Sequence, residues 1–361
     1  MFELDAITKQ VLENCTICDS RHAGLYSICG LALRLRDLYK WEKGLEPWVE
    51  KEPSEVLEWI GEKEEKWDLV GSKEFAPITI AGIQYDPFEP NPINAVLEPH
   101  GLFYGAGYVH SLRPTFFLAV LEGKKEVGGL PVFVLGRELA RDLFTVPALS
   151  QGDFIVLRKE SAKLFLWDSI FFVRKSGRAA LKVALGAYGL EEDDRKGLQN
   201  LLGSMSEVEM ETYMYHELGE MKDTIFDRSL WRDILSTFRH TPIELLARAV
   251  KDLLADTNEY GTLHHIVKAR RTASLAFYAA FFDGLRKELF PEFMTAFQAF
   301  TRARDWRVVQ EAVCAGYHSA SRLAEEISGI YREGKRKRSM EWAKREMERR
   351  LLSPLGILKK P

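Results

Sequence analysis

The chain has 361 residues, of which 46% are hydrophobic and 29% are charged. This ordinary composition excludes bulk disorder, a collagen-like repeat and a disulfide-stapled miniprotein, and the length predicts two domains. The formal charge of −3 is unevenly distributed, because residues 332–361 contain eleven Lys or Arg and four Glu, a local charge of +7. The sequence therefore predicts a mildly acidic body that ends in a basic segment.

The start of the chain is acidic, whereas a secretory signal would be basic. The longest apolar runs, 115–121 and 273–282, are much shorter than the roughly 20 residues that span a bilayer. Four cysteines in a chain of this length are typical of reduced thiols rather than of a disulfide framework. We therefore expect a soluble, cytoplasmic protein with no membrane span.

The first part of the chain is predicted to be α+β. Apolar residues have helical spacing in three early segments, 2–14, 25–43 and 54–67. Prolines and glycines are then concentrated between Pro77 and Pro147, and the β-branched and aromatic runs among them predict short strands. We expect residues 1–147 to form an α+β domain whose antiparallel strands lie within about 77–136.

After Pro147 the chain has few prolines, and its apolar residues recur with the period of a helix. Long amphipathic segments with short connections predict a large all-α antiparallel helical bundle over residues 148–331. The helices that bear on function are expected at 151–174, 192–202, 206–226 and 261–289. Residues 332–361 are expected to form a basic C-terminal helix and tail.

A C-x-x-C pair, Cys15 and Cys18, is followed by His22 and Cys29. These four residues could supply a tetrahedral Cys3His set to zinc. They also share one stripe of a helix, where free cysteines pack as small hydrophobic side chains. There is no second C-x-x-C pair, and no strand precedes this one as in redox proteins. We therefore favour a buried core over a metal site or redox chemistry.

The strand region contains a second group of candidates. Strand alternation places Tyr104 and His110 on one face and two glycines, Gly105 and Gly107, on the other. This pattern predicts a ligand-binding site with the polar residues Glu98, His100, Tyr104 and His110. The alternative is a hairpin with aromatic packing. A dinucleotide-binding loop is not indicated, because the third glycine and the following helix are missing.

The helix around His216 has the pattern most typical of a metal site. Glu209, His216 and Glu220 share one side of it, and Asp256 follows in a later helix. One helix of a bundle can offer several such ligands, here to iron, manganese or zinc. The opposite side of the helix is apolar, so the alternative is a solvated acidic face.

Three further residues are candidates for catalysis: Glu217, His264 and Arg271. Glu217 lies at the edge of the apolar stripe, so we expect it to be more buried than His216. His264 is expected at the edge of the apolar face of its own helix, with Arg271 further along that face. A cation at a core edge needs a partner, which Glu217 or Asp256 could supply.

Glu209 and His216 in a long helix, followed by Asn258-Glu-Tyr-Gly261 and His264, resemble the pattern of haem-oxygenase-type bundles that hold non-haem iron. The resemblance covers a minor part of the chain and implies a metal site in the helical half. Those proteins complete the site with further ligands, including a paired His and Asp. Here Asp256 and His264 are the nearby candidates, and the late helix adds only His318, on its polar side.

Three functions are compatible with the sequence. The favoured one is a metal-dependent enzyme with a His/carboxylate site in or beside the bundle, where the metal acts as Lewis acid or redox centre on a small-molecule ligand. The first alternative is a non-catalytic interaction or scaffold protein whose basic 332–361 tail anchors an acidic partner. The second is a nucleic-acid binder, which the acidic body disfavours.

Overall fold

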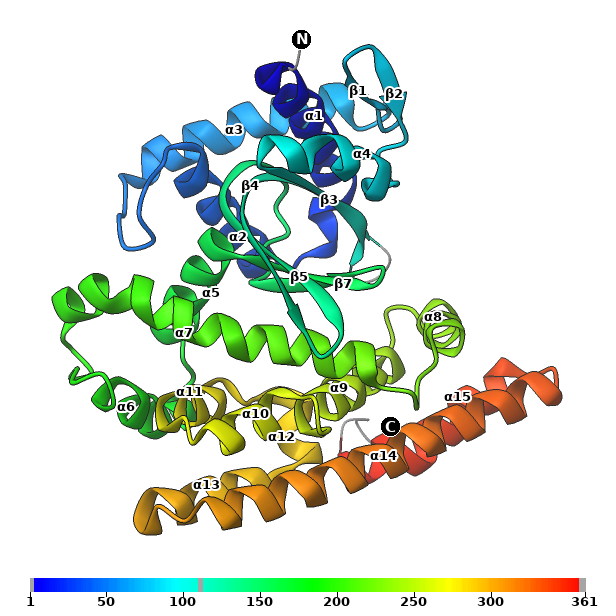
Figure 1. The fold of residues 1–361 in the computed structure, drawn as a ribbon. Coiled ribbons are helices and arrows are strands. Elements are labelled where there is room, and N and C mark those ends of the chain that lie inside the picture. Colours follow the sequence, from blue (N-terminus) through cyan, green and yellow to red (C-terminus); the bar gives the residue numbers. More distant parts are fainter. Residues whose placement is uncertain (1–2, 110–112, 357–361) are drawn as a thin grey trace. The chain divides into compact units, whose positions relative to one another are not determined.

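Three helices precede the strands in the computed structural model, which describes residues 3–109 and 113–356. They are α1 (Leu4–His22), α2 (Ile28–Glu42) and α3 (Pro53–Val70) (Figure 1). The starts of the last two follow from their residues: the Ser27 hydroxyl accepts the amide of Gly30 at α2, and Pro53 occupies the first turn of α3.

A short hairpin, β1 (Ile78–Ile80) and β2 (Ile83–Tyr85), and helix α4 (Pro90–Leu97) lead into a five-stranded sheet. The sheet has the strand order β3-β4-β5-β7-β6. Its strands are β3 (Leu102–Val109), β4 (Arg113–Val127), β5 (Leu130–Arg141), β6 (Ala148–Gln151) and β7 (Phe154–Arg158).

The sheet differs from the prediction in two respects. Its strands continue beyond residue 136, and β5 pairs with β7 in parallel, so the sheet is not purely antiparallel. The helix expected over 151–174 is α5 (Lys159–Phe171), which begins only after β7. The reason is that all five residues of β7 are buried, and a short, continuous apolar run does not distinguish a strand from a buried helix.

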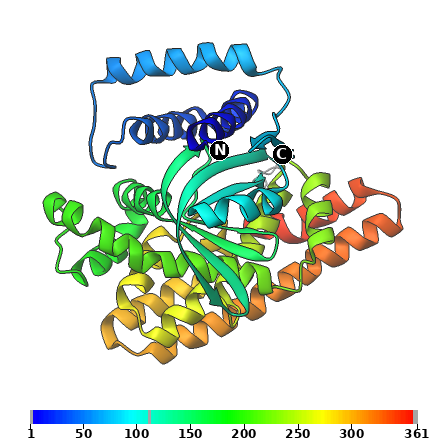
Figure 2. The ribbon, with the colours of Figure 1, turned by 45° about the horizontal axis from the view of Figure 1, so that its top comes forward.

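Both faces of this sheet are buried. On one face Tyr104, Phe116 and Leu118 pack with residues of α1 and α4, and α1 lies across this side (Figure 2). On the other face Phe103 and Phe117 belong to a separate apolar cluster. Alternate residues of β3 and β4 thus enter different cores, as the twofold period of a strand requires.

The edge strand β3 is covered through one side chain of α4. The amide nitrogen of Asn94 donates to the carbonyl oxygen of Tyr104 at 2.8 Å, and its oxygen accepts the Tyr104 amide at 2.7 Å. The Tyr104 hydroxyl donates to the Pro87 carbonyl. These bonds satisfy polar groups that would otherwise be buried without partners.

A buried ion network joins β5, β7 and α5. Glu138 accepts hydrogen bonds from Arg158 at 2.9 and 3.0 Å and from the Ser161 hydroxyl at 2.7 Å, and Arg141 lies 3.5 Å away. Burial alone would raise the pKa of Glu138, but the two arginines outweigh it and lower that pKa. Glu138 and both arginines are almost completely buried, and Arg141 also donates to the Asp37 carbonyl at 2.8 Å.

The rest of the chain is helical between the short connections. Its helices are α6 (Arg178–Gly186), α7 (Arg195–Lys222), α8 (Arg228–Thr237), α9 (Pro242–Thr257), α10 (Thr262–Ala269), α11 (Thr272–Phe281), α12 (Gly284–Leu289), α13 (Pro291–Ala303), α14 (Trp306–Arg336) and α15 (Met340–Met347). The structure is therefore of mixed α+β class, with helices, a sheet and then helices. The two helices expected at 192–202 and 206–226 are one continuous helix, α7.

The chain divides into two compact units. Unit 1 contains Met1–Phe171 and Leu201–Met210, and unit 2 contains Phe172–Asn200 and Glu211–Pro361. The domain boundaries proposed from the sequence, at 147 and 331, stay predictions. Within the described residues, no helix has an apolar stretch long enough to cross a lipid bilayer.

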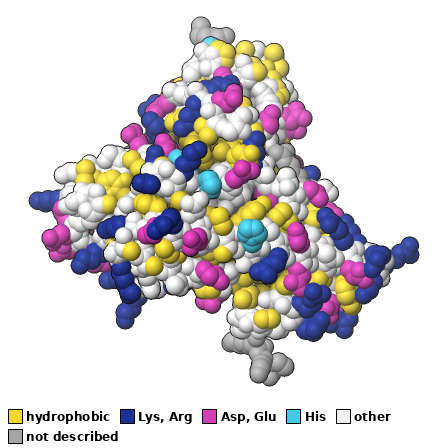
Figure 3. Space-filling view, turned by 60° about the horizontal axis from the view of Figure 1, so that its bottom comes forward, with side chains coloured by type: hydrophobic (Ala, Val, Ile, Leu, Met, Phe, Trp, Pro, Cys, Tyr) yellow, Lys and Arg dark blue, Asp and Glu magenta, His cyan; other side chains and the backbone are white. Residues whose placement is uncertain are grey.

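The basic C-terminal segment is not a detached tail. Residues Ala343, Met347 and Leu352 are buried, and the close approach of α15 to α14 depends on Gly334, where a Cβ would overlap the side chain of Ala343. Several of its cations pair with acids, such as Lys335 with Asp233. On the face drawn in Figure 3, basic and acidic side chains are accordingly interspersed.

Candidate metal centre

The candidate site lies in unit 2, near the end of α7. Helix α7 is capped at its start by Asp194, whose carboxylate accepts the amide of Gly197 at 2.8 Å. His216, Glu217 and Glu220 fall within one turn near the other end of this helix, and all three are half-buried. The spacing of four residues places His216 and Glu220 on the same side of the helix.

His216 is held by a carboxylate from a second helix. Its Nδ1 lies 2.7 Å from Oδ1 of Asp256 on α9, and the side chain of Asp256 is only 3% exposed. The Tyr278 hydroxyl on α11 donates to the other Asp256 oxygen at 2.6 Å, and Arg286 on α12 lies 3.5 Å from it. Asp256 is therefore fixed from two further helices, and it fixes the imidazole in turn.

Gly219 allows α9 to approach α7 closely at this point, because a Cβ there would overlap the carbonyl oxygen of Ala255, next to Asp256. Gly261, at the start of α10, allows the connection after α9 to fold back against Ala255 and Asp256, where a Cβ would overlap the same carbonyl oxygen. The Asn258 side chain donates to the Gly219 carbonyl at 2.8 Å and accepts the amide of Tyr260. The Asn258–Gly261 sequence is thus a structural connection that places Asp256 against His216.

The protonation states follow from these contacts. Burial alone would lower the pKa of His216, but the Asp256 carboxylate and its hydrogen bond outweigh it and raise that pKa to about 10. The pKa of Asp256 is lowered, because His216 and Arg286 outweigh the effect of burial. Burial raises the pKa of the neighbouring Asp252. Without a metal, His216 is therefore an imidazolium at neutral pH.

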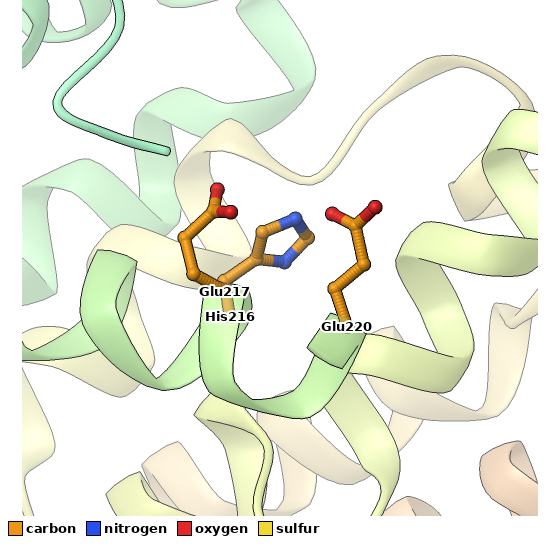
Figure 4. A group of neighbouring side chains, drawn as sticks. All are labelled: His216, Glu217 and Glu220. Carbon is orange, nitrogen blue, oxygen red and sulfur yellow. The ribbon is translucent and has the colours of Figure 1, made fainter. Parts of the chain in front are cut away.

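The second ring nitrogen, Nε2, is not engaged by Asp256. A ligand atom of His216, one of Glu217 and one of Glu220 lie within 4.8 Å of one another, which is close enough for one ion. In Figure 4 the imidazole lies between the two carboxylates. Glu220 also forms an ion pair with Lys251 of α9. These three residues are the only group of this kind among the residues described.

Comparison with known proteins assigns the chain to a family. Residues 6–158 match the N-terminal domain, and residues 163–350 the C-terminal domain, of a family of unknown function (DUF6866). The chain belongs to the DUF6866 family. No curated protein and no solved structure matches it. The whole candidate centre lies within the DUF6866 C-terminal domain.

The predicted metal ligands of this DUF6866 chain are partly brought together. His216 and Glu220 meet, while Asp256 contacts the other side of the His216 ring through Nδ1. Glu209 is buried two turns earlier on α7 and is not part of the three-residue group. Asp256 and Lys251 of α9 contact the face of α7 around His216, which is therefore partly covered.

Of the predicted catalytic residues, only Glu217 joins this group. His264 is exposed, not at a core edge as expected, because α10 ends at Ala269 and buries Thr262, Leu263 and Ile266 instead. Arg271 forms an ion pair with Glu211 at 2.5 Å, beside His265, whose ring stacks on Tyr215.

Glu217 and His216 are both half-buried, so the expected contrast in their burial is not found.

Three members of the ligand-binding group predicted in the strand region are described by the structure, and they lie in different surroundings. Tyr104 is buried in the core, whereas His100 is exposed and Glu98 lies 3.6 Å from Lys124. His110 lies outside the described residues. Tyr104 therefore has a packing role in the core of unit 1.

The prediction of a buried core holds for Cys15 and Cys18 but not for Cys29, because α1 ends at His22 and Cys29 lies on α2. Cys15 and Cys18 are buried free thiols that donate to the carbonyls of Phe116 and Pro114. Burial raises the pKa of the Cys15 thiol far above its usual range, which opposes the thiolate form needed for metal binding. Cys29 is exposed, and His22 is half-buried at the end of α1.

Sequence reasoning missed four residues of the centre: Lys251, Asp252, Tyr278 and Arg286. Lys251 and Asp252 precede Asp256 by about one turn on α9, so a search of the turn before each candidate carboxylate would have found them. Tyr278 and Arg286 come from separate helices. No spacing rule connects them to His216, and only the packing of the helices reveals them.

Proposed function

We propose that the chain is a metal-dependent enzyme whose centre binds a divalent transition metal through His216, Glu217 and Glu220. One observation carries the proposal: Asp256 occupies Nδ1 of His216, and the carboxylates of the two glutamates lie near the same ring. Metal-binding histidines nearly always donate their second ring N–H to a carboxylate or carbonyl, which orients the ring and increases its basicity.

The charge of the site supports a cation at this place. Glu217, Glu220, Asp252 and Asp256 surround His216 together with Lys251 and Arg286. With His216 protonated, four acids face three cations. A divalent ion that replaces the proton of His216 balances the four carboxylates, and Glu220 then shares its charge between the metal and Lys251.

The donor set favours iron, manganese or zinc. One imidazole and two carboxylates form a mixed nitrogen and oxygen set that suits these ions, and three protein ligands leave coordination positions for water or substrate. A metal held in this way would act as a Lewis acid and lower the pKa of a bound water. In this arrangement Glu217, which the sequence suggested as a catalytic residue, is a metal ligand.

Metal titration of the chelator-treated protein tests the proposal. We expect one equivalent of Mn²⁺, Fe²⁺ or Zn²⁺ to bind, with binding lost in His216→Ala and weakened in Glu220→Gln. His318→Ala is the matched control, because His318 is exposed on α14 and its Nδ1 lies 2.7 Å from the Cys314 carbonyl. If His216→Ala binds as much metal as the wild type, the proposal is wrong.

The scaffold alternative makes a different prediction. Removal of the segment from residue 340 onward should then release an acidic partner without affecting any metal bound at His216. Because Met347 and Leu352 are buried, the charge-reversed variants Lys344→Glu and Arg345→Glu on α15 disturb the fold less than truncation does and test the same idea.

We also propose the reducing, cytoplasmic location expected from the sequence, and the four free cysteines support it.

A further inference from the structure

A cavity of about 200 Å³ lies in unit 1, between the end of α2, the loop that follows it, β5 and the start of α5. It is unrelated to the metal centre proposed above. The charged residues of its wall are Asp37, Lys40, Glu46, Arg141, Glu160 and Lys163. Its apolar surface comes from Trp41, Leu45, Pro47 and Leu164. The volume is below that of a drug-sized pocket, so it suits a ligand of a few heavy atoms.

The cations of this wall already have partners. Lys40 donates to the Pro47 carbonyl and to Glu50, both at 2.7 Å. Lys163 pairs with Glu46 at 2.5 Å. Arg141 donates to the Asp37 carbonyl at 2.8 Å, lies 3.5 Å from Glu138, and covers the Trp41 ring. An anionic ligand would have to compete with each of these contacts.

Glu160 differs from the other acids of the wall. Asp37 binds Arg36, and Glu46 binds Lys163, whereas Glu160 accepts one backbone amide, that of Glu138, at 2.9 Å. Among the residues that the structure describes, no Lys, Arg or His forms an ion pair with it. Burial raises the pKa of Glu160, and the nearby Glu138 carboxylate adds to this effect, while the Glu138 amide and the charges of Arg141 and Arg137 oppose it without cancelling it.

We propose that this cavity binds a small organic ammonium ion, with the Glu160 carboxylate as its counter-ion and the Trp41 and Leu164 side chains against its alkyl part. A primary ammonium group donates charge-assisted hydrogen bonds to a carboxylate, and these are about twice as strong as neutral ones. The ligand class is therefore a short alkylamine, not a carboxylic acid or an alcohol of the same length.

Calorimetric titration of the full chain with n-butylammonium chloride, sodium butyrate and n-butanol at equal ionic strength tests this inference. We expect n-butylammonium to bind one site with a Kd in the millimolar range or tighter, n-butanol to bind at least tenfold more weakly, and butyrate not to bind. Tighter binding of butyrate, or no binding of n-butylammonium, would overturn the inference.

The second arm uses a pair of variants with the same change in charge. Glu160→Gln should weaken n-butylammonium binding about tenfold or more, because it removes the counter-ion. Glu122→Gln should bind as the wild type does, because Glu122 lies outside the cavity and pairs with Lys159. Equal affinity of both variants would contradict the role of Glu160. The comparison of the three ligands uses the wild type, so it tests the preference of the cavity for an ammonium ion even if Glu160→Gln does not fold.

Discussion

The Glu138 network of unit 1 and the His216 cluster of unit 2 contain similar groups in different surroundings. In the first, Glu138 lies between two arginines and a hydroxyl, and all of them are almost completely buried. In the second, only Asp256 is fully buried, while the His216 side chain is 27% exposed. Both oxygens of Glu138 in this closed network are occupied by the groups around it, whereas the half-open cluster around His216 has a second ring nitrogen that Asp256 does not engage and two glutamates close enough to share an ion.

The largest effect is expected from opening the closed network. Glu138→Ala leaves Arg141 and Arg158 buried without their counter-charge, so the free energy of unfolding should fall by about 3 to 5 kcal/mol. Urea denaturation followed by circular dichroism measures it. The control is Glu122→Ala. It removes an exposed ion pair with Lys159, so the free energy of unfolding should fall by at most about 1 kcal/mol. Equal losses would mean that Glu138 behaves as a surface charge.

The half-open cluster should show a pH dependence between pH 7 and 10, whereas the lowered pKa of Glu138 makes the closed network sensitive to acid instead. Because the pKa of His216 is raised from 6.5 to about 10, its contribution to stability is fully present below pH 6.5 and is lost as the pH rises towards 10. Metal-free protein should lose about 2.5 kcal/mol from this group between pH 7 and pH 9. Denaturation of the wild type and of His216→Gln at several pH values isolates the contribution of His216 to the free energy of unfolding, because the contributions of all groups common to both proteins cancel in the difference. Parallel pH profiles would refute the assignment.

The orienting role of Asp256 can be tested separately from its charge. Asp256→Asn keeps a side chain that can reach Nδ1 of His216 but removes the negative charge, so metal affinity should fall about 10- to 100-fold. The metal titration described above measures it. Asp305→Asn, which changes a surface N-cap of α14, is the matched control and should leave metal affinity unchanged.

The smallest effect is expected at the contact between α7 and α9. Gly219→Ala places a methyl group against the Ala255 carbonyl, which should separate the two helices and cost roughly 1 to 2 kcal/mol. Gly203→Ala is the control on the same helix. Its Cβ meets nothing within 4 Å, so the higher helix propensity of alanine should stabilise the protein slightly. Thermal unfolding of both variants decides whether the close approach matters.

The sequence predicted best where one residue's neighbours along the chain decide its environment. The early helices, the strand-rich middle region and the pairing of His216 with Glu220 all follow from short-range spacing. The burial of Cys15 and Cys18 was favoured for the same reason.

Prediction failed where the chain breaks a helix without a clear signal, or where a distant segment decides. The helix expected over 261–289 is interrupted at Arg270, a non-glycine residue in the left-handed conformation, so the apolar face drawn along that longer helix does not apply to His264. The parallel partner of β5 lies beyond a connection that contains β6. The clamp of Tyr278 and Arg286 on Asp256 joins three helices, and no local pattern encodes such a contact.

The hydrogen bonds between Asn94 and Tyr104 have a consequence for the behaviour of the protein at high concentration. Strand β3 is an outer strand of the sheet, and exposed outer strands can recruit strands from other molecules. The Asn94 amide occupies both the donor and the acceptor that an incoming strand would use at Tyr104. A single side chain from α4 thus opposes intermolecular strand addition at this position.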